Sequence, residues 1–224
     1  MPRPIPTRIF HITPIANLAK IFTAREIHSK NVLLAKGEAH ESIAHASIQS
    51  RRATKRVTIA PGGVIHDYVP FYFAPRSPML YSIQNGKVDG CSWRQQDIVH
   101  IESTVERVVA CEGKFVVYPL NAALDYSADC FNNIEGVNQV DWSIFLEEPL
   151  LDGYSKYFHS RPNPTNHFMR MEKRQAELLV YGSVPLSAIT RIGVMSDVKR
   201  IEVAHLLSQH GVELSAEVKS NWYF

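Results

Sequence analysis

Two adjacent arginines end the motif IQSRR at residues 48–52, in a segment rich in basic and small residues. Residues 36–56 read as a loop that runs into a helix. Ala44, Ile48 and Arg52 are spaced by four, so Arg52 is expected on the same helix face as two apolar residues. An arginine on an inward face needs an anion, and no Asp or Glu lies within one turn of it. Its partner could be a carboxylate from elsewhere in the fold or a bound phosphate.

A carboxylate and a histidine each lie at the end of an expected strand. Glu177 stands at the leading edge of a strand expected from Leu178 to Tyr181. A carboxylate beside buried apolar residues either forms an ion pair or takes part in the chemistry of a site. His11 lies near the end of an expected strand from Thr7 to Ile12, just ahead of a helix N-terminus. Free backbone N–H groups there can bind a phosphate, although a lone histidine is more often structural.

The segment from Pro61 to Tyr81, PGGVIHDYVPFYFAPRSPMLY, holds four of the thirteen prolines and three of the nine tyrosines. It predicts a glycine turn, a short buried strand over Val69 to Phe73, and a helix capped by Ser77 and ended by Asn85-Gly86. His66-Asp67-Tyr68 and Arg76 stand between these elements. Polar groups in such places are either hydrogen-bonded or functional. The alternative to a functional role is that this segment is a tightly packed corner, braced by its prolines, with a structural role alone.

The other expected elements follow from apolar spacing and turn residues. Residues 119–164 are rich in Asn, Asp, Tyr and Pro, with Trp142 and Phe145 as anchors, as is typical of a long binding loop. Helices are expected around residues 15–22 (capped by Thr13-Pro14), 105–110 and 201–210, and strands over Asp97–Ile101, Phe115–Tyr118, Ile189–Val194 and Val212–Leu214.

Composition is that of an ordinary globular protein of 224 residues, and one domain is the default expectation. No apolar run is long enough to span a bilayer and no signal peptide is recognisable. Three widely spaced cysteines form no zinc pattern, and free thiols favour a reducing cytoplasm. Residues 1–60 carry ten Lys/Arg and three Asp/Glu, a net +7, whereas residues 97–152 carry two and eleven, a net −9. The basic part suits a polyanion, although solvated surface lysines and arginines are the commoner case.

Taken together, these stretches resemble the DarT family, bacterial toxins that ADP-ribosylate DNA. The resemblance covers essentially the whole chain, and residues 61–81 are its most specific part. It is carried by FHIT at 10–13, IQSRR at 48–52, PGGVIHDYVPFYFAPRSPMLY at 61–81, KRQAELLVY at 173–181 and the terminal WYF.

The resemblance implies an α+β fold of the ADP-ribosyltransferase kind. This is a split, mostly antiparallel β core flanked by helices, in a single domain over residues 1–224. It implies NAD+ as co-substrate, with no metal, and a catalytic pair of Arg52 and Glu177. Glu177 would stabilise the positive charge that develops on the ribose, and Arg52 would hold the pyrophosphate. The other NAD+-binding positions implied are His11, Ile12, Thr13 and, more loosely, Lys20 and His28; Lys20 departs from the small residues common at its place.

The resemblance also implies the acceptor and the partners. The family modifies thymine in single-stranded DNA in a short sequence context, which blocks replication, and a DarG-like macrodomain antitoxin reverses the modification. The substrate-facing loop would lie within residues 119–176. Candidate DNA contacts are Tyr68, Tyr72, Arg76 and Tyr154, although a given aromatic is more often part of the core.

The sequence leaves three other hypotheses about function open. The same fold could modify protein or RNA, because a loop decides the acceptor. A non-enzymatic nucleic-acid-binding module could use the basic N-terminal part. A metal nuclease is weaker, since the carboxylates of residues 97–152 form no recognised constellation with histidine. His40, His45, His159 and His167 also lack ligand spacing.

Overall fold

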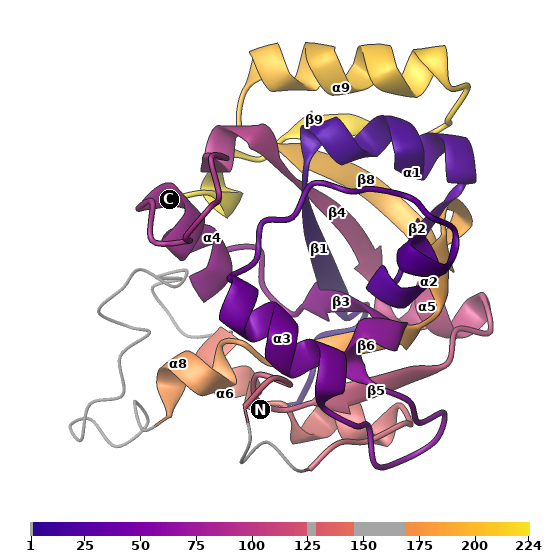
Figure 1. Cartoon of the computed structure of the whole chain (residues 1–224), viewed down its shortest axis with the longest axis vertical. Helices are drawn as coiled ribbons and strands as arrows, with labels where there is room; N and C mark the ends of the chain where they lie inside the picture. Colours follow the sequence, from indigo (N-terminus) through magenta and orange to yellow (C-terminus); the bar gives the residue numbers. More distant parts are fainter. Residues whose placement is uncertain (1, 125–128, 146–168) are drawn as a thin grey trace.

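The computed structural model describes residues 2–124, 129–145 and 169–224 (Figure 1). Its strands are β1 (Arg8–Pro14), β2 (Glu26–His28), β3 (Tyr68–Tyr72), β4 (Ile98–Thr104), β5 (Phe115–Tyr118), β6 (Glu177–Tyr181), β7 (Ser183–Pro185), β8 (Ile189–Val194) and β9 (Ala216–Val218). Its α-helices are α1 (Leu18–Ala24), α2 (Lys30–Ala35), α3 (Ala46–Thr54), α4 (Pro78–Gln84), α5 (Val105–Ala110), α6 (Trp142–Phe145), α8 (Arg170–Lys173) and α9 (Asp197–Gln209). Short 3-10 turns include η1 (Ile15–Asn17) and η2 (Ile65–Asp67).

Seven strands form one sheet in the order β5-β6-β3-β1-β4-β8-β9, and β2 and β7 pair separately. All neighbours are antiparallel except β8 and β9. The central strand β1 pairs with β4 over its whole length, from Arg8 opposite Thr104 to Pro14 opposite Ile98. The expectation of a mixed fold with a mostly antiparallel β core and flanking helices is confirmed.

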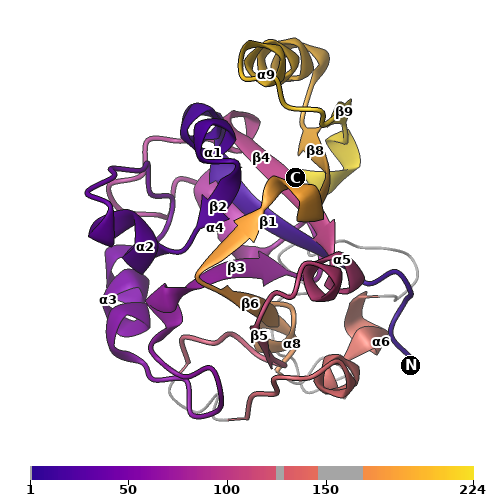
Figure 2. The same ribbon diagram turned by 90° about the vertical axis from the view of Figure 1, so that its right-hand side faces the viewer.

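Helices cover both sides of this sheet, as the two views show (Figures 1 and 2). At one end α1 and α9 pack together, with Leu18 and Phe22 of α1 and Val203 and Leu207 of α9 buried in the main hydrophobic core. On another side, α2 and α3 lie together beside β3 and β6. One face of β3, carrying Tyr68, Pro70 and Tyr72, lines the same cavity as residues of α2 and α3.

Most expected elements are present, within a few residues of the expected bounds. Ser77 caps α4 as predicted, since its hydroxyl accepts a hydrogen bond from the Leu80 backbone N–H. The prediction of a strand over Val212–Leu214 is wrong. The Val212 N–H instead bonds to the Leu207 carbonyl and closes α9, so the strand begins later, at β9. Thr13 is also not a helix cap, because β1 continues through it.

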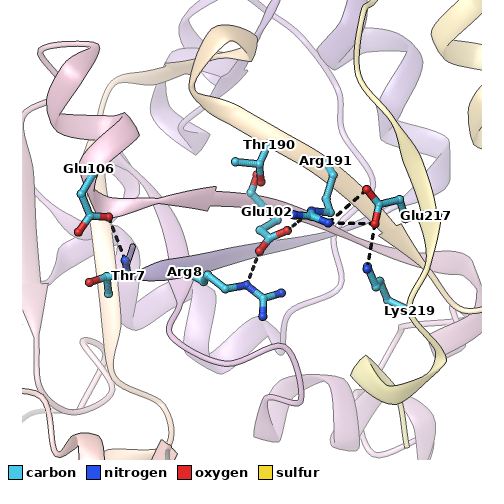
Figure 3. Close-up of polar contacts among 8 residues, drawn as sticks. All are labelled: Thr7, Arg8, Glu102, Glu106, Thr190, Arg191, Glu217 and Lys219. Atoms are coloured by element: carbon cyan, nitrogen blue, oxygen red, sulfur yellow. Dashed lines mark hydrogen bonds and ion pairs between the residues drawn. The ribbon is translucent and has the colours of Figure 1, made fainter. Parts of the chain in front are cut away.

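A cluster of charged side chains connects four neighbouring strands of the sheet, β1, β4, β8 and β9 (Figure 3). The Glu102 carboxylate, on β4 and 3 % exposed, pairs with Arg8 of β1 and lies 2.6 Å from Arg191 Nε of β8. Arg191 also contacts Glu217 of β9 at 3.0 Å, and Lys219 Nζ lies 2.9 Å from the same carboxylate. These side-chain contacts add to the backbone ladders that already pair β1 with β4, β4 with β8 and β8 with β9.

Candidate active site

The predicted catalytic and NAD+-binding residues gather around one cavity of about 390 Å³. Its walls come from β1, α1, β2, α2, residues 38–45, α3, β3 and the first residue of β6. The sheet supplies a rigid floor, and α2, α3 and the segment between them supply the opposite wall. Of the predicted site residues, the cavity is lined by His11, Ile12, Thr13, Lys20, His28, Arg52, Tyr68, Tyr72 and Glu177.

Arg52 and Glu177 form an ion pair at the base of this cavity. Arg52 Nη1 donates to Glu177 Oε2 at 3.0 Å and to Oε1 at 3.2 Å. The two side chains are only 11 % and 2 % exposed. The Ala122 backbone N–H also donates to Glu177 Oε1, at 3.2 Å. The anion that the inward-facing arginine requires is thus a carboxylate 125 positions along the chain, brought to it by the sheet.

The Arg52 guanidinium is not fully satisfied by this pair. Its Nη2 is buried and has no hydrogen-bond partner among the described residues. An unsatisfied buried donor costs free energy unless a ligand meets it, and guanidinium groups bind phosphate and hydroxyl oxygens well. The residues therefore fit an anionic, hydroxyl-rich ligand such as NAD+ in this cavity.

Strand register places an aromatic hydroxyl beside the same carboxylate. Tyr72, at the end of β3, lies opposite Glu177 across the β3–β6 ladder. Burial raises the pKa of the Tyr72 hydroxyl, the Glu177 charge raises it further, and Arg52 opposes both effects. Tyr72 is therefore a protonated hydrogen-bond donor at neutral pH, beside the catalytic candidates.

His11 lies on the adjacent strand and has a defined tautomer. Its Nδ1 is 2.9 Å from the Pro70 carbonyl oxygen, which accepts only, so Nδ1 carries the proton. Burial lowers the pKa of His11, although the bond to Pro70 opposes this effect. The ring is thus neutral at pH 7, with Nε2 as an acceptor for a ligand hydroxyl or amide. Thr13 and Ile12 are buried on the same strand.

Lys20 and His28 line the cavity but already have protein partners. Lys20 Nζ donates to the Ala39 carbonyl at 2.6 Å. Lys36 Nζ lies 2.8 Å from His28 Nε2, and His28 Nδ1 lies 2.9 Å from the Ser183 hydroxyl. In this structure both ring nitrogens of His28 are engaged. A direct role for either residue in binding NAD+ stays a prediction.

The predicted DNA contacts are spread over three environments. Tyr68 is 2 % exposed and donates its hydroxyl to the Gly62 carbonyl at 2.6 Å, so stacking of a base on its ring gains no support. Arg76 does not line the cavity, and its guanidinium lies 5.8 Å from the Phe224 ring centroid. Tyr72 lines the cavity close to Glu177 and Arg52, where an acceptor base would have to come. Tyr154 lies outside the described residues.

Sequence reasoning missed the polar residues that hold this site together. Asn17 exchanges two hydrogen bonds with the Glu41 backbone, both at 2.9 Å, and so anchors the 38–45 segment. Gln49, one turn before Arg52, contacts two further cavity residues. No local motif marks either residue, because their partners are distant in the sequence.

Comparison with known proteins decides the family. The family described as "ssDNA thymidine ADP-ribosyltransferase, DarT" matches residues 10–224. The chain belongs to the DarT family. It is thus an NAD-dependent ADP-ribosyltransferase that acts on thymidine in single-stranded DNA.

Curated DarT relatives and solved DarT structures match along nearly the whole chain. A DNA ADP-ribosyl transferase of Thermus sp. (strain 2.9) is 35 % identical over 99 % of this chain and 98 % of its own length. One from Escherichia coli O127:H6 is 29 % identical over 88 % of this chain and 85 % of its own. The structure of Thermus sp. 2.9 DarT with ADP-ribosylated ssDNA covers 100 % of this chain and 99 % of its own, with a TM-score of 0.85 and 33 % identity. Its complex with NAD+ has a TM-score of 0.80 and 30 % identity, covering 99 % and 100 %.

Among the described residues of this DarT chain, no helix is long and apolar enough to cross a membrane. No three His, Cys, Asp or Glu side chains within them are grouped so as to hold a metal ion.

Proposed function

We propose that Arg52 and Glu177 are the catalytic pair with which this enzyme transfers ADP-ribose from NAD+ to thymine. The observation that carries the proposal is the buried ion pair lining the cavity, with one guanidinium nitrogen that has no hydrogen-bond partner among the residues the structure describes. A site that keeps a strong donor unsatisfied is prepared for a ligand oxygen. Membership of the DarT family supports the same two positions, through IQSRR and QAE.

Bound NAD+ supplies a C–N bond that can be cleaved between nicotinamide and ribose, with positive charge developing on the sugar. Glu177 is held by Arg52 and by the Ala122 N–H, so its carboxylate is fixed before the charge appears. A fixed carboxylate stabilises that charge without having to reorient. Arg52 would turn its unpartnered Nη2 to a pyrophosphate or ribose oxygen and orient the donor.

His11 and Tyr72 complete the polar part of this site. His11 offers an unprotonated Nε2 to a hydroxyl or amide hydrogen, whereas Tyr72 offers a phenol O–H to an oxygen. Their opposite hydrogen-bonding roles suit a ligand with both hydroxyl and phosphate groups. Both side chains are partly buried in the cavity wall, where a bound donor would displace water that could otherwise hydrolyse it.

The acceptor would be a thymine ring nitrogen of a single strand. An unpaired base is reached without the few kcal/mol that duplex unstacking costs. The relative in complex with ADP-ribosylated ssDNA supports this acceptor for the present chain. Contacts from Arg76 and Tyr154, and the preferred sequence context, belong to this proposal.

We further propose that the 224-residue chain acts as one catalytic domain, as a cytoplasmic toxin paired with a DarG-like macrodomain antitoxin. The domain proposal is supported by the family match over residues 10–224. Thermosipho africanus DarTG in complex with ADP-ribose shares the fold at 16 % identity and a TM-score of 0.70, over 97 % of this chain and 51 % of that one. Co-expression with a macrodomain hydrolase should relieve growth arrest and remove the DNA modification. Persistent arrest with the modification removed would count against a DNA target.

The decisive test is incubation with NAD+ and thymine-containing single strands, with thymine-free strands as controls, read by intact mass. We expect one ADP-ribose on thymine-containing strands alone, and none with Glu177→Ala or Arg52→Ala. Glu213→Gln, an exposed carboxylate far along the chain, is the matched control and should retain activity. Labelling of protein or RNA instead would move the acceptor, and full activity of Glu177→Ala would refute the catalytic assignment.

A further inference from the structure

The helix that carries Arg52 has little apolar anchoring, and its one aliphatic side chain larger than alanine, Ile48, is half-buried at the cavity. None of the nine residues of α3 is buried. Most helices are fixed on a protein by burial of an apolar face, which removes the helix's freedom to rotate or slide. Polar contacts therefore have a large part in setting the position of α3, and so the position of the Arg52 guanidinium.

The contact nearest to Arg52 along α3 is made by Gln49, one turn earlier. Gln49 Oε1 lies 3.0 Å from Lys30 Nζ and 2.9 Å from His66 Nε2. A lysine ammonium can only donate, so the Gln49 atom that faces it is the carbonyl oxygen. His66 Nε2 faces the same oxygen and must carry a proton. Gln49 thus accepts one bond from the start of α2 and one from η2.

The protonation of His66 is consistent with this arrangement. Burial, followed by the charges of Lys30 and Arg52, lowers the pKa of His66 to about 4, although Asp67 opposes this. The ring is neutral at pH 7 and has a single N–H, which the geometry assigns to Nε2. Asp67 in turn accepts from the Asn31 side chain at 2.7 Å and from the Val64 N–H at 2.7 Å, so η2 is itself firmly held.

The two ends of α3 are tied by other polar contacts. Before the helix, the Glu41 backbone is paired with Asn17. After it, Lys55 bonds through its side chain to the Leu124 carbonyl and through its own carbonyl to the Ile65 N–H. These ties hold the segments that flank α3. Within α3, Gln49 makes the side-chain contacts at the turn before Arg52, next to the Arg52–Glu177 pair itself.

We propose that Gln49 is a positioning residue for Arg52: by accepting hydrogen bonds from Lys30 and His66 it sets the rotation of α3 that brings Arg52 to Glu177. This inference rests on the proposed catalytic role of Arg52 and deepens it. A misplacement of about 1 Å in a catalytic group costs on the order of 10²-fold in rate. Loss of the Gln49 acceptor should therefore reduce kcat by about 10- to 100-fold and leave the NAD+ KM nearly unchanged.

Gln49 also lines the cavity, so the rival is a direct contact between its amide and a ligand. Two pairs of variants separate these roles. Gln49→Met removes the acceptor. His66→Phe removes the donor, whereas His66→Gln keeps an N–H at the position of Nε2. Ser50→Ala is the matched control, because the exposed Ser50 hydroxyl donates to the Ala46 carbonyl of α3 itself.

The positioning role predicts that Gln49→Met and His66→Phe each lower kcat, and that the double variant is no worse than the worse single. His66→Gln and Ser50→Ala should behave like the wild type. A ligand contact would instead raise the NAD+ KM in Gln49→Met and leave His66→Phe nearly unaffected. That result, or additive losses in the double variant, would overturn the proposal.

Hydrogen exchange of the α3 amides tests the tether without any activity measurement. Exchange at residues 49–55 should rise in Gln49→Met and His66→Phe, while it remains at the wild-type rate in His66→Gln and Ser50→Ala. Unchanged exchange in Gln49→Met would refute the tether. Because this readout needs no turnover, it stays decisive even if Arg52→Ala retains transfer and the catalytic assignment fails.

Discussion

Removing the Glu177 carboxylate should lower stability as well as activity, because Arg52 is left as a buried charge without its anion. At 3.0 Å the pair is worth about 5 to 6 kcal/mol by Coulomb's law at an effective dielectric constant of about 20. Measured losses on breaking buried pairs are about 3 to 5 kcal/mol. Arg52 retains 11 % exposure toward the cavity, so we expect the lower end of that range, about 3 kcal/mol, for Glu177→Ala.

The assay is thermal unfolding of four proteins: the wild type, Glu177→Ala, Arg52→Met and the double variant Arg52→Met/Glu177→Met. For a chain of this length, about 3 kcal/mol corresponds to a Tm about 6 to 12 °C lower. The double variant should regain at least half of this loss, because two apolar side chains need no counter-charge. The Ala122 N–H would still lose its acceptor, which costs about 1 kcal/mol.

Two results would refute this reasoning. A Tm of Glu177→Ala within about 2 °C of the wild type would mean that Arg52 is solvated through the cavity and is not a buried charge. A double variant less stable than either single would mean that the pair itself stabilises the fold. Glu213→Gln, which changes an exposed carboxylate, should unfold as the wild type does in both comparisons.

Three further predictions concern other parts of the site and the sheet. Glu102→Gln should destabilise the fold by about 1 to 2 kcal/mol, because the buried side chain loses its charge-assisted contacts while Arg8 and Arg191, 49 % and 36 % exposed, stay partly solvated. Urea unfolding measures this, and a change under about 0.5 kcal/mol would contradict it. Hydrogen bonds from Lys219 and Arg191 lower the pKa of Glu217 to about 2. The stabilising effect of its carboxylate is therefore complete above the unfolded-state pKa and is lost as pH falls from about 4.5 toward 2. In Glu217→Gln the free energy of unfolding, measured with urea, should depend less on pH over that window, and an unchanged pH slope would contradict this. Tyr72→Phe should lower kcat by about tenfold. The shape of the pH–rate profile between pH 7 and about 10 should stay the same, because the raised pKa of Tyr72 keeps its phenol protonated over that range. Loss of an alkaline limb from the profile of the variant would contradict this.

The sequence was informative wherever a local pattern fixed a local structure. Ser77-Pro78 predicted the start of α4, and the apolar runs of β3, β5, β6 and β8 predicted strands within a residue or so of their bounds. The requirement for an anion near Arg52 was also correct, because it rests on the cost of burying an unpaired charge. The identity of that anion follows only from the β3–β6 pairing, which brings Glu177 beside α3.

The expected elements failed where tertiary contacts override local preference. Val212 has the apolar character of a strand residue, but it closes the last turn of α9 and packs into the core. Ala44 was expected on the Arg52 helix face, whereas α3 begins at Ala46 and buries no residue. Asn17 and Gln49 gave no signal at all, since an amide's value as an anchor depends on partners that folding brings to it.

Two buried carboxylates on the same sheet show why pairing alone does not identify a catalytic site. Glu102 and Glu177 are 3 % and 2 % exposed, and both contact arginine. Both oxygens of Glu102 meet guanidinium groups, and it does not line the cavity. Within the described residues each pair leaves a buried polar atom without a hydrogen-bond partner, Arg52 Nη2 in one and Glu102 Oε2 in the other. Only Arg52 and Glu177 line the cavity, so open volume beside the pair, and not burial or incomplete pairing of charge, distinguishes a place prepared for a ligand from a structural ion cluster.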